Sequence, residues 1–199
     1  VGSEMCIRDS SISDRVPGWL ENSDKGWLTA EYNMLPGSSD QRISRKSFEG
    51  GRSKEISRLI GRSLRAVCNL GIINGYSFTV DCDVLEADGG TRTASINGAW
   101  IALNDTFTKM VNENKLVQNP FTCKVGAISV GIVGGELVAD LDYAKDSNAE
   151  VDLNLVLDEK FEILEIQGTA EGKPFSKDSL DSLFNIAKEC VQEIFKIQN

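Results

Sequence analysis

Two short segments of this 199-residue chain carry groups that could bind phosphate. Arg52 follows two glycines at the start of a predicted helix, and the first turn of a helix offers unpaired N–H groups to anions. Residues 88–93 (DGGTRT) precede a second predicted helix, and there the Gly90 turn, the Thr91 hydroxyl and the Arg92 guanidinium suit phosphate oxygens. In both cases an ordinary loop with solvated side chains is the alternative.

A third segment is acidic. Asp146 and Asp152 lie six residues apart, with Glu150 between them, on a loop that runs into a predicted strand. Two such carboxylates could hold a divalent cation through oxygen atoms and leave room for a substrate phosphate. A solvated acidic loop is the alternative.

The residue types that are missing narrow the chemistry. The chain contains no histidine, which excludes Ser-His-Asp and Cys-His catalysis and every histidine-ligated metal site. Its five cysteines form no CxxC pair, and we expect them to be reduced thiols, mostly in the core. Two arginine-bearing anion sites and one acidic site suit phosphoryl transfer, because cations stabilise its transition state. Without a histidine base, an already anionic nucleophile such as inorganic phosphate is favoured.

Basic residues concentrate in one window of an otherwise acidic chain. The net charge of −9 argues against nucleic-acid binding by the whole surface. Residues 42–65, however, hold eight basic and two acidic side chains, a net charge of +6, which leaves −15 for the rest. Arg42, Arg45 and a stripe of arginines at helical spacing could follow an RNA backbone. The stripe consists of Arg58, Arg62 and Arg65. A solvated helix face or an interface between subunits explains the stripe equally well.

Hydrophobic periodicity predicts an α+β fold, with helices packed on a mostly antiparallel sheet. The predicted strands are 26–34 and 77–85, the hairpins pair 123–133 with 136–143 and 151–157 with 161–167, and the helices are 53–70, 93–114 and 176–196. We expect one domain over residues 11–199. Residues 1–10 show no clear periodicity, and we set them apart as a non-native leader.

The sequence gives no sign of a membrane protein. No apolar run reaches the roughly 20 residues needed to cross a bilayer, and no basic start followed by an apolar stretch marks a secretory signal. We therefore expect a cytoplasmic protein without a membrane partner.

The sequence resembles the bacterial ribonuclease PH family in collinear blocks over residues 11–199. The most specific block is TVDCDVLEADGGTRTASINGA at 79–99, and two others are GGRSKEISRLIGRSLRA at 50–66 and DLDYAKDSNAEVDLN at 140–154. The resemblance implies the two-layer ribonuclease PH-like fold, which polynucleotide phosphorylase and exosome ring subunits share. The resemblance does not include the family's amino-terminal strands, so we expect a domain that is truncated at its start.

The resemblance implies a phosphorolytic 3′→5′ exoribonuclease, also called tRNA nucleotidyltransferase. In that family, inorganic phosphate is the co-substrate, attacks the end of a tRNA precursor or another structured RNA, and releases a nucleoside diphosphate. Mg²⁺ or Mn²⁺ is the implied metal. A homo-hexameric ring, built as a trimer of dimers, is the implied assembly.

The family's site residues can be placed on this chain through its motifs. The phosphate ligands match Arg52, Gly90, Thr91 and Arg92. The catalytic, metal-binding aspartates match Asp146 and Asp152. The RNA-binding arginines match Arg42 and Arg45.

Two alternatives share this fold. One is a non-catalytic, exosome-like ring subunit or RNA-binding module, and the other is an inactive fragment of the enzyme. A non-catalytic subunit could lose its carboxylates or phosphate ligands, whereas this chain keeps both sets, which favours the enzyme.

Overall fold

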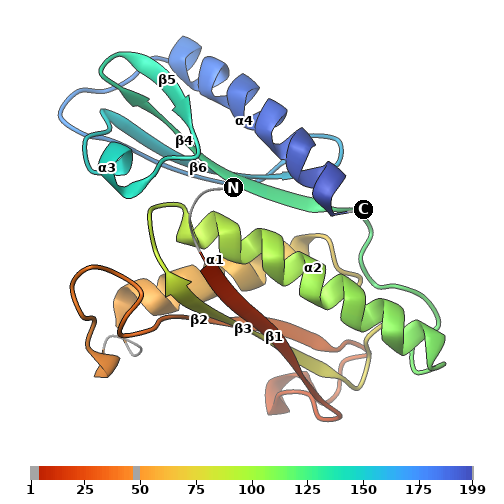
Figure 1. The fold of residues 1–199 in the computed structure, drawn as a ribbon. Coiled ribbons are helices and arrows are strands. Elements are labelled where there is room, and N and C mark those ends of the chain that lie inside the picture. The colour runs from red at the N-terminus through yellow and green to blue at the C-terminus, as the bar shows by residue number, and fades with distance from the viewer. Residues whose placement is uncertain (1–4, 47–49, 199) are drawn as a thin grey trace.

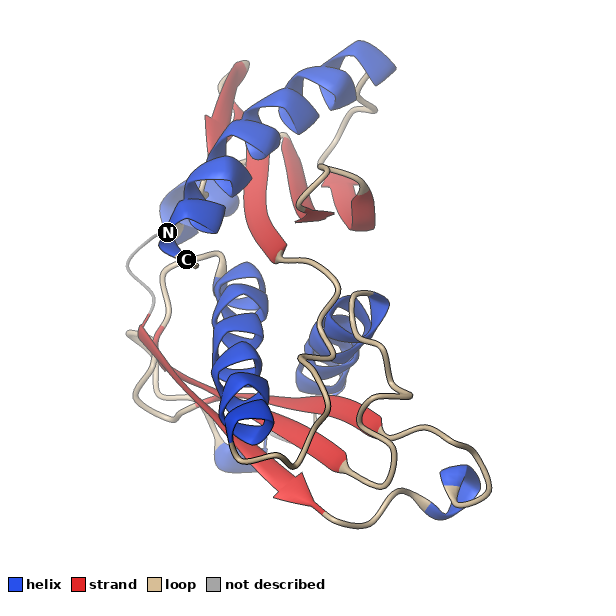
Figure 2. Cartoon of the chain, turned by 90° about the vertical axis from the view of Figure 1, so that its right-hand side faces the viewer, coloured by secondary structure: helices blue, strands red, loops and turns tan. Residues whose placement is uncertain are grey.

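The computed structural model of the chain describes residues 5–46 and 50–198. Two sheets and their helices stack in four alternating layers (Figures 1 and 2). Helices α1 and α2 lie between the two sheets, and α4 covers the outer face of the second sheet (Figure 1). In chain order the elements are β1 (Met5–Ser13), η1 (Gly18–Leu20), β2 (Trp27–Met34), α1 (Gly51–Ala66), β3 (Ser77–Glu86), α2 (Thr91–Asn112), β4 (Val125–Val133), β5 (Glu136–Ala139), α3 (Tyr143–Asp146), β6 (Val151–Asp158), β7 (Ile163–Ala170) and α4 (Lys177–Ile197).

The first sheet has the strand order β1-β3-β2. Its central strand β3 pairs antiparallel with β1 and parallel with β2. A parallel pair needs a crossover connection, and α1 provides it between β2 and β3. Because parallel strands end at the same edge of a sheet, the chain leaves β2 and β3 on the same side. From that edge it enters the first turns of α1 and α2.

The second sheet has the order β5-β4-β6-β7 and is antiparallel throughout. Strand β5 pairs only with the last four residues of β4, so Ala127 has no partner strand on that side. The side-chain amide of Asn97, on α2, pairs there instead. Its Nδ2 donates to the Ala127 carbonyl at 2.8 Å, and the Ala127 N–H donates to its Oδ1 at 2.7 Å. This pair of buried hydrogen bonds joins α2 to the second sheet.

Two apolar cores fill the layers. The larger core lies around α1, α2 and the first sheet, and it includes Val125 and Ala127 of β4. The smaller core lies between the second sheet and α4, and it includes Ile128 and Val130 of the same strand. Since β4 contributes side chains to both cores, continuous packing holds the two sheets together.

The predicted α+β class is confirmed, and the predicted elements lie within a few residues of those observed. The expectation of mostly antiparallel pairing is also confirmed, because β2 with β3 is the one parallel pair among the described strands, but the strands are divided between two sheets rather than one. Helices pack on each of the two sheets, so the expected two-layer arrangement of helices on a sheet occurs twice. The second strand of the first hairpin ends early, at Ala139, and the short helix α3 follows. The four cysteines described with their side chains are free thiols.

The segment set apart as a leader takes part in the first sheet. Residues 5–10 form the start of β1 and pair with residues 80–86 of β3. Their exclusion from the fold is therefore wrong, whereas their non-native origin stays a prediction.

None of the helices in the described parts of the chain combines the length and the apolar character needed to cross a membrane.

Candidate active site

A cavity of about 1240 Å³ opens between the carboxyl-terminal edge of the first sheet and the second sheet. Its wall is formed by the loop after β2, the start of α1, the turn before α2, and residues of β4, α3 and β6. The predicted site residues that line this cavity are Arg42, Arg52, Gly90, Thr91, Arg92, Asp146 and Asp152. Arg45 is exposed and lies outside this lining. The fold thus brings the predicted anion-binding and acidic segments to one place.

The glycine-rich turn forms one end of the cavity. Gly89 and Gly90 have φ values of +86° and +48°, a left-handed conformation that favours glycine. Gly90 is the N-cap of α2, and no side chain caps that helix start. The buried Thr91 hydroxyl lies 2.7 Å from the hydroxyl of Tyr32 on β2, which fixes the first turn to the sheet. An uncapped helix start that faces a cavity is suited to bind an anion.

The glycine-rich turn also touches the acidic segment directly. A Cβ atom at Gly89 would lie 2.2 Å from the carbonyl oxygen of Leu141, closer than any side chain allows. The backbone N–H of Tyr143 donates to Asp88 Oδ1 at 3.1 Å. Glycine at position 89 therefore allows the turn before α2 to approach the segment that precedes Asp146.

Arginines reach the cavity from three segments of the first half. Arg52 lies in the first turn of α1, whose N-cap Gly50 provides no side-chain cap and whose first turn has no acidic residue. Arg42 comes from the loop after β2, and Arg92 comes from the first turn of α2. Their positive charges make this wall of the cavity suited to phosphate groups.

The two aspartates come from the second half. Asp146 ends α3 and is exposed, whereas Asp152 is the second residue of β6 and is half-buried. Burial raises the pKa of Asp152, and the charge of Asp146 raises it further, while the nearby Arg92 opposes the shift. Asp146 and Arg92 are therefore both close enough to Asp152 to influence its charge.

This donor set fits a hard divalent cation. Mg²⁺ in proteins commonly takes one or two carboxylates and completes its coordination with water and substrate phosphate. Asp146 and Asp152 supply two carboxylates at the wall of an open cavity. Within residues 5–46 and 50–198, no group of three or more acidic or cysteine side chains is arranged to hold a metal.

Two arginines of the α1 stripe have partners inside the chain. Arg62 donates to both carboxylate oxygens of Glu165 on β7, at 2.9 and 2.7 Å. Arg65 donates to the carbonyl oxygen of Leu28 at 2.8 Å, and its Cζ lies 4.5 Å from the ring centroid of Trp27. These contacts hold α1 against both sheets, a role that the spacing of the arginines did not indicate.

Sequence reasoning missed a polar row on the second sheet. The strand register aligns Ser129, Asn154 and Gln167 across β4, β6 and β7. Ser129 and Asn154 are buried and line the cavity, and Gln167 accepts a hydrogen bond from Arg92 at 3.0 Å. The alternation of Asp152 and Asn154 on a predicted strand could have located Asn154. Nothing in the local sequence marked Gln167.

Two family models match the chain. The model of domain 1 of the 3′ exoribonuclease family matches residues 10–108, and the model of domain 2 matches residues 123–190. The chain belongs to the 3′ exoribonuclease family. The first match ends within α2 and the second begins just before β4, so the family describes as two domains what we expected as one. The cavity lies at their junction: Arg42, Arg52 and Arg92 belong to the match of domain 1, and Asp146 and Asp152 belong to the match of domain 2.

Within the 3′ exoribonuclease family, two curated relatives of this chain are ribonuclease PH proteins. A ribonuclease PH of Dehalococcoides mccartyi is 50% identical over 201 residues, which cover 100% of this chain and 84% of that protein. The ribonuclease PH of a second strain is 50% identical over 200 residues, which cover 99% and 83%.

Solved structures share the fold at low sequence identity. An exosome of Archaeoglobus fulgidus with RNA bound to the active site gives a TM-score of 0.79 at 19% identity, covering 100% of this chain and 81% of the matched one. The crystal structure of rice Rrp46 gives a TM-score of 0.74 at 16% identity, covering 99% and 83%. At these identities the likeness supports the ribonuclease PH-like fold alone.

Proposed function

We propose that this member of the 3′ exoribonuclease family is a phosphorolytic 3′→5′ exoribonuclease that trims the 3′ ends of tRNA precursors. One observation carries the proposal: a single cavity holds Arg52 and Arg92 together with Asp146 and Asp152. The 50% identity to ribonuclease PH proteins supports the same conclusion. A non-catalytic ring subunit would have no need for this pairing of opposite charges.

In this proposal, inorganic phosphate binds against the arginine-rich wall. Arg52 and Arg92 hold its oxygens, and the first turn of α2 with the Thr91 hydroxyl adds donors. A phosphate oxygen attacks the phosphorus of the last phosphodiester and forms a new P–O–P bond. The bond from that phosphorus to the 3′ oxygen breaks, the 3′ oxygen takes up a proton, and the terminal nucleotide leaves as a nucleoside diphosphate.

Asp146 and Asp152 act on the leaving group of the same reaction. Asp146 and Asp152 would hold Mg²⁺ or Mn²⁺, and the cation would supply positive charge to neutralise the scissile phosphate and the leaving oxygen. The carboxylates must be ionised for this, and burial, which raises the pKa of Asp152, opposes its charged form.

RNA and a ring assembly complete the proposal. Arg42 at the cavity, and Arg45 three residues further along the chain, guide the 3′ end of tRNA precursors and other structured RNAs through their phosphates. We place the reaction in the cytoplasm and expect a hexameric ring, a trimer of dimers.

The test is a phosphate-dependence assay. The protein is incubated with Mg²⁺ and a tRNA that carries a 3′ extension, with and without inorganic phosphate, and the released nucleotides are identified. We expect nucleoside diphosphates only when phosphate is present. The Asp152→Asn variant is the matched control, because it keeps the size of the side chain and removes its charge.

Other outcomes would assign other functions. Nucleoside monophosphates released without phosphate would indicate a hydrolytic nuclease. RNA binding without any release would favour the non-catalytic ring subunit. Light scattering on the same sample measures whether the particle contains six copies.

A further inference from the structure

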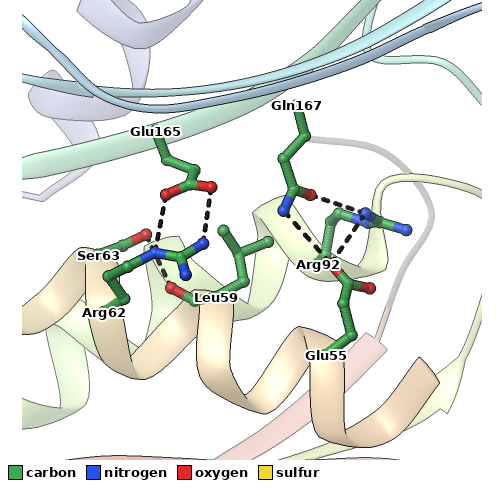
Figure 3. A network of polar contacts seen from close by, with 7 residues as sticks. All are labelled: Glu55, Leu59, Arg62, Ser63, Arg92, Glu165 and Gln167. Carbon is green, nitrogen blue, oxygen red and sulfur yellow. Dashed lines mark hydrogen bonds and ion pairs between the residues drawn. The ribbon is translucent and has the colours of Figure 1, made fainter. Parts of the chain in front are cut away.

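Arg92 is held by two side chains from outside its own helix (Figure 3). Its Nη1 donates to Gln167 Oε1 on β7 at 3.0 Å and lies 3.8 Å from Glu55 Oε1 on α1. Gln167 Nε2 in turn donates to the same Glu55 oxygen at 3.3 Å. The three side chains form a closed triangle that joins α1, α2 and β7.

This triangle uses only one edge of the guanidinium group. Another guanidinium nitrogen of Arg92 points away from both Gln167 and Glu55 (Figure 3). Gln167 is a neutral acceptor, so it orients Arg92 without neutralising it, whereas Glu55 is a partly solvated carboxylate at a longer distance. Arg92 thus keeps both its positive charge and further N–H donors for a ligand in the cavity. A bidentate contact with such a ligand depends on the orientation of the guanidinium plane.

We infer that Gln167 is a positioning residue, which holds the Arg92 guanidinium in the orientation that binds the attacking phosphate. The inference rests on the proposed phosphorolytic function. Gln167 is not among the residues that line the cavity, and it acts through Arg92. Its place on β7 means that the second sheet sets the geometry of an anion site whose ligands belong to the first half of the chain.

The same strand provides a matched control. Glu165 lies two residues before Gln167, and it bonds Arg62 of α1 at 2.9 and 2.7 Å (Figure 3). Neither Glu165 nor Arg62 lines the cavity. Glu165→Gln removes the negative charge from this second contact between β7 and α1 and leaves the contact between Gln167 and Arg92 in place.

The experiment compares Gln167→Met with Glu165→Gln. Methionine has a similar length and no amide, so the hydrogen bond to Arg92 is lost with little change in packing. We expect Gln167→Met to raise the KM for phosphate at least about fivefold and to leave the KM for RNA unchanged. Glu165→Gln should leave both KM values unchanged. An unaltered phosphate KM in Gln167→Met, or an equal rise in both variants, would overturn the positioning role.

A binding measurement separates this inference from the proposed function. Thermal unfolding is followed while inorganic phosphate is added, without RNA. The inference requires a phosphate-induced rise in Tm that Gln167→Met weakens and Glu165→Gln keeps, whether or not RNA is degraded. If the unaltered protein shows such a rise but no phosphorolysis, the proposed function fails and the positioning role stands. If it shows no rise, Arg92 holds no phosphate and the positioning role falls.

Discussion

The contact between the glycine-rich turn and the acidic segment can be tested with Gly89→Ala. Position 89 combines a left-handed φ of +86° with a Cβ position 2.2 Å from the Leu141 carbonyl oxygen. Position 135, in the turn between β4 and β5, has a similar φ of +79°, but a Cβ there meets nothing within 4 Å. Gly135→Ala therefore measures the conformational cost alone, and Gly89→Ala measures that cost together with the collision.

The two costs can be given magnitudes. An L-residue in the left-handed region costs about 1–2 kcal/mol, and we expect Gly135→Ala to lower the free energy of unfolding by that amount. Normal carbon–oxygen contacts begin more than about 3 Å apart, so at Gly89 the backbone of one segment must move by roughly 1 Å. Overpacking of this kind adds about 1–3 kcal/mol, which gives a total of about 2–5 kcal/mol for Gly89→Ala.

Urea denaturation measures both free energies, and the phosphate-dependence assay measures activity on the same samples. We expect phosphorolysis to fall at least about 100-fold in Gly89→Ala, because a shift of about 1 Å separates the phosphate turn from the aspartates. Gly135→Ala should stay near the unaltered rate. Equal losses of stability in the two variants, or full activity in Gly89→Ala, would refute the argument that close contact at position 89 builds the site.

Three further predictions follow from other contacts. Asn97→Ala leaves the N–H and carbonyl of Ala127 without their partners, so we expect urea denaturation to show a loss of about 2–4 kcal/mol. Tyr32→Phe removes the partner of the buried Thr91 hydroxyl and should cost about 1–2 kcal/mol in the same assay, with weaker protection by phosphate. Asp152→Asn should abolish turnover, retain RNA binding in a filter assay, and raise the Tm of metal-free protein at neutral pH. The raised pKa of Asp152 means that folding opposes its charged form, so this gain in Tm should vanish as the pH falls and the unaltered carboxyl becomes protonated.

Local patterns were enough to predict most elements and to mark the segments that meet at the cavity. Strand β3 alternates buried Phe78, Val80, Cys82 and Val84 with less buried residues, and α4 begins after Ser176, whose side chain accepts from the Ser179 N–H. The phosphate and acidic segments were found because each is a short, contiguous motif. Their meeting in one cavity needed the tertiary fold.

The features that were missed depend on pairing between distant segments. Alternation shows that β2 and β3 are strands, but it does not reveal their direction or the division of the strands between two sheets. Gln167 and Arg92 are 75 residues apart, and only the register of β7 brings them together. Residues 5–10 carry no periodic apolar signal, and their place in the first sheet depends on backbone pairing with β3.

Residues from both halves of the chain build the cavity, and this limits how the protein can be cut into fragments or recombined with a relative. The arginines proposed to bind phosphate, Arg52 and Arg92, lie before the connection at 113–124, and the proposed metal ligands Asp146 and Asp152 lie after it. Neither half carries both these arginines and this pair of aspartates, so two separate fragments cut within that connection should each be inert and should complement each other only after they associate. Swaps of one half between related proteins should succeed only when the contacts across the junction, Asn97 with Ala127 and Arg92 with Gln167, are kept as matched pairs.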